Sequence, residues 1–116
     1  MKILALSTDQ ELNLLRTHAL GAGGHAVVVV NSEKESLAAV EAVAQYDVVL
    51  LCHRLPASTA RQIVRMLRQK QSEAKIVYIA HLYGEWPEVE ADRYVVGADG
   101  PEALMRVLEE VATAAV

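Results

Sequence analysis

The stretch DVVLLCHRLP at residues 47–56 tells most about the architecture of this chain. Residues 48–51 within it are all aliphatic, with no polar residue between them. Strands of a parallel sheet have this pattern when helices cover both faces, because neither side of the strand then meets water. We therefore predict a buried parallel strand at residues 48–51.

Four further segments have the same composition and are expected to be buried on both faces in the same way. These strands are predicted at residues 3–6, 26–30, 76–80 and 94–96. Apolar residues recur at helical spacing outside the strands, namely Leu12, Leu15 and Ala19; Leu37, Val40 and Ala44; Ile63, Met66 and Leu67; and Leu104, Val107, Leu108 and Val111. This alternation predicts an α/β fold with a doubly wound parallel sheet, since five strands are too few to close into a barrel.

Glycines mark two of the connections. Residues 21–24 (GAGG) follow the first predicted helix and can end it with a residue at positive φ. Gly100 precedes Pro101, which suits the first position of the last helix. The glycine cluster precedes a strand instead of opening a helix, so it lacks the order of a phosphate-binding loop. We interpret it as a turn.

Length and charge restrict the class of protein. The 116 residues, 53% of them hydrophobic, suit a single domain spanning residues 1–116. The net charge is −4 and the basic residues are scattered except in residues 61–70, so we expect no nucleic-acid partner. The single cysteine excludes an internal disulfide, and the first apolar run is too short to span a membrane. We expect a cytoplasmic protein without membrane contact.

Three stretches resemble the CheY-like receiver domains of bacterial response regulators. Residues 2–12 are similar to the opening strand and acidic loop of the family, and residues 92–104 to its closing strand and the start of the helix that follows. Leu55 and Pro56 are similar to the residues that follow its third strand. The resemblance implies a five-stranded, flavodoxin-like parallel sheet with strand order 2-1-3-4-5 and a site at the carboxyl ends of the first and third strands.

The residues at the family's phosphorylation site depart from its pattern. Where the resemblance implies the acidic pair that holds Mg²⁺, this chain has Ser7 and Thr8. Cys52 replaces the phosphoacceptor aspartate, Ala80 the hydroxyl residue after the fourth strand, and Gly97 the lysine after the fifth. Hydroxyl groups and a thiol do not supply the charge that Mg²⁺ requires. We expect a degenerate phosphorylation pocket with no metal or cofactor, and no aspartyl phosphorylation.

Asp9, His53 and His81 are expected at the rim of this pocket. Cys52, His53 and His81 could in principle bind Zn²⁺, but they lack the closely spaced ligand pair of typical zinc sites. We interpret Cys52 more simply as a buried residue, because a cysteine outside a disulfide packs like a small hydrophobic side chain.

The connection from His81 to Asp92 is short for a parallel crossover. We expect the family's fourth helix to be shortened or missing. Trp86 and Val89 in this connection either fold back over the core or form an interaction surface together with Tyr94 of the fifth strand. We expect this surface to join two copies in a homodimer.

The leading hypothesis is a receiver-like signalling or regulatory module that works without phosphorylation. It would bind another signalling protein, such as a kinase or regulator, or a second copy of itself, and would not be an enzyme. The alternative is a small thiol-dependent or phosphotransfer protein that uses Cys52 with His53. A flavin-binding protein is disfavoured, because residues 7–12 contain no glycine to cradle a flavin phosphate.

Overall fold

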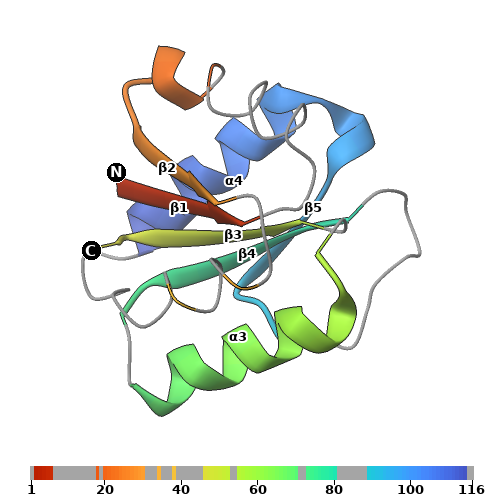
Figure 1. Cartoon of the computed structure of the whole chain (residues 1–116). Helices are drawn as coiled ribbons and strands as arrows, with labels where there is room; N and C mark the ends of the chain where they lie inside the picture. Colours follow the sequence, from red (N-terminus) through yellow and green to blue (C-terminus); the bar gives the residue numbers. More distant parts are fainter. Residues whose placement is uncertain are drawn as a thin grey trace.

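The computed structural model describes residues 2–6, 18, 20–30, 34, 38, 46–52, 55–70, 73–80 and 89–114. A parallel sheet of five strands runs through them in the order β2-β1-β3-β4-β5 (Figure 1). The strands are β1 (Lys2–Leu6), β2 (Ala26–Val30), β3 (Val48–Cys52), β4 (Lys75–Ala80) and β5 (Arg93–Val96). The predicted strand order is confirmed, and each predicted strand agrees with the observed one to within one residue at either end.

Helices lie on both faces of the sheet (Figure 1). α3 (Ala57–Gln69) covers one face and α4 (Pro101–Ala114) covers the other. A short 3-10 helix, η2 (Gly97–Asp99), joins β5 to α4, and residues 18 and 20–22 are also helical. None of the helices within the described ranges is long and apolar enough to cross a bilayer.

Alternate residues of the central strands enter two separate cores. In β1, Leu4 and Leu6 belong to the core beneath α3, the α3-side core, whereas Ile3 and Ala5 belong to the core beneath α4, the α4-side core. β3 and β4 divide between the two cores in the same way. Because both faces of these strands are buried, every position favours an apolar residue. This explains the continuous apolar runs in the sequence.

The two outer strands are less buried than predicted. Val28 of β2 is 42% exposed and Tyr94 of β5 is 41% exposed. The prediction that all five strands are buried on both faces is therefore wrong for β2, in which no residue is fully buried, and for Tyr94 of β5. An edge strand has a neighbouring strand on one side only, so side chains at the margin of the sheet keep contact with water.

Two glycines have the positive φ that their turns require. Gly24 has a φ of 86° just before β2, and its N–H donates to the carbonyl of Gly21 at 3.0 Å. Gly100 has a φ of 85° just before α4, and Pro101 is the first residue of that helix. Both predicted turns are confirmed.

The prediction of a shortened or missing fourth helix concerns the chain between β4 and β5. Residues 81–88 of this connection lie outside the described residues, so it stays a prediction. Residues 89–92, which complete the connection, are not helical and lead directly into β5.

Candidate functional site

Three of the predicted pocket residues lie at the carboxyl edge of the sheet. Cys52 is the last residue of β3 and pairs with Ile79 of β4. Ala80 is the last residue of β4 and pairs with Val96, the last residue of β5. Gly97 follows immediately as the first residue of η2. The register therefore brings these three positions to the ends of neighbouring strands.

Burial and residue type leave little reactivity at these positions. Cys52 is 1% exposed and Ala80 is completely buried, whereas Gly97 is exposed but has no side chain. Together they offer a buried thiol and a methyl group, and no carboxylate, hydroxyl or amine. Phosphoryl transfer relies on oxygen ligands that hold Mg²⁺ and on cations that neutralise the phosphoryl charge. These three residues supply neither.

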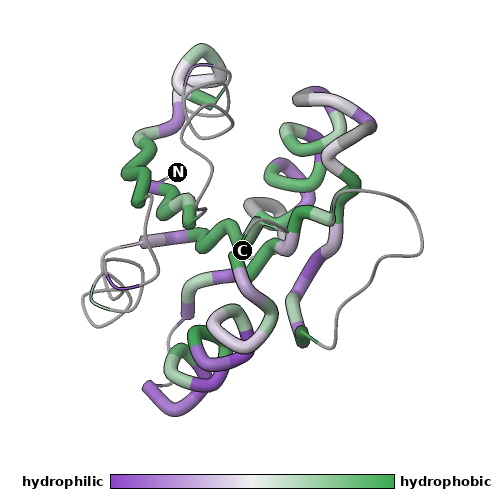
Figure 2. The backbone as a smooth tube through the Cα atoms, turned by 45° about the vertical axis from the view of Figure 1, so that its right-hand side comes forward, coloured by the Kyte–Doolittle hydropathy of each residue, from purple (hydrophilic) through white to green (hydrophobic). Residues whose placement is uncertain are grey.

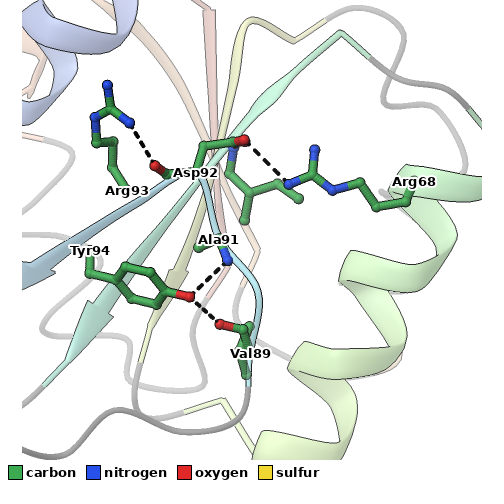
Figure 3. A network of polar contacts seen from close by, with 7 residues as sticks. Arg68, Val89, Ala91, Asp92, Arg93 and Tyr94 are labelled. Carbon is green, nitrogen blue, oxygen red and sulfur yellow. Dashed lines mark hydrogen bonds and ion pairs between the residues drawn. The ribbon is translucent and has the colours of Figure 1, made fainter.

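A network of polar contacts lies at the opposite, amino-terminal edge of the sheet (Figure 3). The carboxylate of Asp92 accepts hydrogen bonds from the backbone N–H of Ile76 at 2.7 Å and from the guanidinium of Arg68 at 3.3 Å. The N–H of Asp92 donates to the Ile76 carbonyl at 2.8 Å. Asp92, which directly precedes β5, thus joins β4, β5 and α3 at one point.

Asp47 makes a similar junction at the start of β3. Its carboxylate accepts a hydrogen bond from the N–H of Lys2 at 2.8 Å, and its N–H donates to the Lys2 carbonyl at 2.8 Å. Its carbonyl accepts from the N–H of Lys75 at 2.9 Å. Neither this aspartate nor Asp92 was predicted to have this role. Asp47 directly precedes an apolar run, which is a signal that could have found it, whereas Arg93 follows Asp92 and interrupts that pattern.

Tyr94 fixes the segment that precedes its own strand. Its hydroxyl donates to the Val89 carbonyl at 2.5 Å and accepts from the Ala91 N–H at 3.0 Å (Figure 3). Its ring centroid lies 6.4 Å from that of Tyr78, and the two rings are tilted by 54°. These contacts hold the Tyr94 ring in one place at the margin of the sheet.

Burial lowers the pKa of His25, the residue before β2, and the positive charge of the chain's amino terminus lowers it further. Both effects favour the neutral imidazole in the folded protein. His25 precedes its strand and so belongs to the amino-terminal edge of the sheet, away from Cys52 and Ala80.

Solved structures of other proteins share this architecture, although no protein-family model and no curated protein matches the chain. Chemotaxis protein CheY4 of Vibrio cholerae matches with a TM-score of 0.80 and 22% sequence identity, covering 95% of this chain and 97% of that one. Response regulator TrrA of Thermotoga maritima, solved in complex with Mg²⁺ and BeF, gives a TM-score of 0.78 and 22% identity over 95% and 97% of the two chains. A two-component response regulator of Clostridium difficile matches with a TM-score of 0.78 and 16% sequence identity, covering 97% of this chain and 96% of that one. The chain has the fold of a response regulator receiver domain.

The other predicted pocket residues of this receiver fold are Ser7, Thr8, Asp9, His53 and His81, and they lie outside the described residues. Their places at the pocket and its rim therefore stay predictions. In the part of the chain that is described, no three His, Cys, Asp or Glu side chains are grouped so that they could hold a metal ion.

The structure describes two residues of the predicted interaction surface, Tyr94 and Val89, and the surface itself stays a prediction. Tyr94 is 41% exposed, as an interface residue should be. Val89 is 3% exposed and belongs to the α3-side core, so its assignment to an exposed surface is wrong. For Val89 the alternative holds, in which this stretch folds back over the core. Trp86 lies outside the described residues.

Proposed function

We propose that the chain is a receiver-like signalling module that works without aspartyl phosphorylation and acts by binding another protein. The observation that carries this proposal is the buried Cys52 at the end of β3, where the receiver resemblance puts the phosphoacceptor. Ala80 and Gly97 at the adjoining strand ends add no group that could take over its role.

The chemistry of an acyl phosphate supports this view. The nucleophile has to be a carboxylate, and Mg²⁺ has to be held by hard oxygen ligands. The related fold of TrrA was solved with Mg²⁺ and BeF. In this chain a thiol stands at the acceptor position, and we propose that Ser7 and Thr8 leave the metal position without its acidic pair.

The proposed partner is a signalling protein, either a kinase or regulator or a second copy of the chain, in the cytoplasm. Tyr94 supports a contact at β5, because its exposed ring lies on an edge strand and aromatic residues are enriched at interfaces. A module of this kind would transmit a signal by association and would not be an enzyme. The thiol-dependent alternative, with Cys52 and His53, gains no support, since a nucleophilic thiol has to be reached by its substrate and Cys52 is 1% exposed.

Intact-mass spectrometry after incubation with acetyl phosphate and Mg²⁺ tests the proposal. We expect no phosphoryl adduct, and no change in the protein's fluorescence on addition of beryllofluoride. TrrA is the positive control for beryllofluoride, since it was solved with that ligand. A Mg²⁺-dependent adduct on this chain would overturn the proposed function.

A further inference from the structure

The outward face of α3 carries an unusual row of cations. Arg61, Arg65 and Arg68 are exposed and follow one another at spacings of four and three residues, so they lie along one side of the helix. We call these three residues the arginine ridge. From Ala57 to Lys70 there is no acidic residue, although the whole chain has 15 acidic and 11 basic residues. Hydrophilic stretches along this helix are visible in Figure 2.

Of the three ridge residues, only Arg68, at one end, forms an ion pair within the described residues. Arg68 contacts Asp92 at 3.3 Å and its side chain is 48% exposed. Arg61 and Arg65 form no ion pair with a carboxylate of the described residues. By contrast, Arg93 on the edge strand β5 approaches Glu110 of α4 at 4.0 Å. Two exposed arginines therefore remain available for a contact outside the chain.

The stability of α3 does not explain these two arginines. The helix is held by its inner face, where Ile63, Val64 and Leu67 are buried in the α3-side core. Like charges four residues apart repel each other on a helix, so the pair Arg61 and Arg65 is unfavourable in the isolated protein. An anionic partner placed across both guanidinium groups would relieve this repulsion.

The chemistry of the ridge favours carboxylates on a partner protein. A guanidinium binds a carboxylate through two parallel hydrogen bonds, which a lysine ammonium does not do. Carboxylates four residues apart on another helix repeat the spacing of Arg61 and Arg65, about 6 Å along the axis. A nucleic acid fits less well, because all 15 acidic residues lie outside α3 and give the chain a net charge of −4.

We propose that Arg61 and Arg65 are a docking surface for an acidic helix of a partner protein. This surface lies on the face of the sheet opposite to α4 (Figure 1). It gives the binding module of the proposed function a site and a partner chemistry, and it rests on that function.

A synthetic peptide tests the surface directly. The probe is a fluorescein-labelled, alanine-based helix of about 20 residues, long enough to form in water, with glutamates four residues apart. The same peptide with glutamine in place of glutamate is the probe's control. Binding is followed by fluorescence anisotropy at low and at physiological salt, because charge contacts weaken as salt rises. We expect the glutamate peptide to bind and the glutamine peptide not to bind.

Two single variants with the same charge change distinguish an effect of the arginine ridge on peptide binding from an effect of the protein's net charge. Arg65→Glu should weaken binding about ten-fold or more, whereas Arg106→Glu, at an exposed arginine of α4, should change it less than about two-fold. Unfolding curves in urea should show both variants folded, since both positions are exposed. An equal loss of affinity in the two variants, or a parent that does not bind the glutamate peptide, would overturn the proposal. So would a DNA duplex that binds the ridge more tightly than the peptide does.

The phosphodonor experiment remains a separate readout. A Mg²⁺-dependent phosphoryl adduct on the parent would reject the proposed function, whereas the measured affinity for the glutamate peptide would be unaffected by that result. A parent that takes up no phosphoryl group and binds no glutamate peptide would reject the ridge alone. The two failures are therefore distinguishable.

Discussion

The carboxylate of Asp92 lies 2.7 Å from the backbone nitrogen of Ile76 and joins the start of β5 to the start of β4. Ile76 is completely buried, and the Asp92 side chain is 25% exposed. The two residues are 16 positions apart in the sequence. Because a buried N–H without a partner is costly, this contact stabilises the attachment of the edge strand β5.

Replacement of Asp92 by alanine should therefore destabilise the protein by about 1–3 kcal/mol, because it leaves the Ile76 N–H without its side-chain acceptor. Asp92→Asn keeps an acceptor oxygen and should lose less. Arg68→Ala removes only the longer, half-exposed contact and should cost less than about 1 kcal/mol. Urea unfolding of the three variants gives the order, and an Arg68→Ala variant as unstable as Asp92→Ala would contradict it.

The fold was predictable because its strongest signals are local. β1, β3 and β4 are buried on both faces, so their continuous apolar runs marked them in the sequence. The exposure of Val28 in β2 was not predictable in the same way. Its apolar run resembles that of a central strand, and only the strand order implied by the receiver resemblance put it at the edge of the sheet.

The site was harder to predict because its contacts join distant residues. Cys52, Ala80 and Gly97 were found through the receiver resemblance, which supplied the strand ends to inspect. The Asp47 contact spans 45 residues and the Asp92 contact spans 16. In both, the donor is a backbone N–H, which the type of the residue does not reveal. Val89 lies outside any helix or strand, so no periodicity indicated its burial.

Cys52 should react slowly with thiol reagents in the native protein and rapidly after unfolding in urea. The reason is access, since the residue is 1% exposed and a reagent reaches it only when the structure opens. Labelling with Ellman's reagent gives both rates. Native labelling as fast as that of the unfolded chain would instead favour the thiol-dependent alternative.

Cys52→Asp should not restore phosphorylation. Under the proposed function, Ser7 and Thr8 stand where the acidic pair for Mg²⁺ would be, and Ala80 and Gly97 supply no hydroxyl or amine, so the new carboxylate would have no metal or cation beside it. A carboxylate in this buried position should also lower stability, because a buried charge without a partner is costly. Intact mass after acetyl phosphate and the urea midpoint measure the two effects. Phosphorylation of Cys52→Asp alone would show that the remaining residues suffice.

His25 should make the protein less stable as the pH falls below neutrality. Its pKa in the folded protein lies below the ordinary histidine value of 6.5, so the unfolded chain binds the proton first. The contribution of His25 to the free energy of unfolding is therefore complete above pH 6.5. It is lost as the pH falls from 6.5 through the lower pKa of the folded protein. His25→Gln should remove this part of the pH dependence in urea unfolding. An unchanged slope in the variant would contradict a role for His25.

Self-association through β5 should depend on the exposed ring of Tyr94. Tyr94 is 41% exposed on an edge strand, and its hydroxyl already contacts Val89 and Ala91. Tyr94→Lys, which puts a charge at the edge, should abolish a dimer, whereas Tyr94→Phe keeps the ring and should retain it. Tyr94→Phe should also cost about 1 kcal/mol of stability, because the Val89 carbonyl and Ala91 N–H lose their partner. Val89→Asp is no test of the surface, since a carboxylate in the α3-side core would unfold the protein.

Light scattering over a dilution series measures the association. A parent that stays monomeric at high micromolar concentration, or a Tyr94→Lys variant that associates equally well, would exclude β5 as a homodimer surface and leave Tyr94 with its structural role alone.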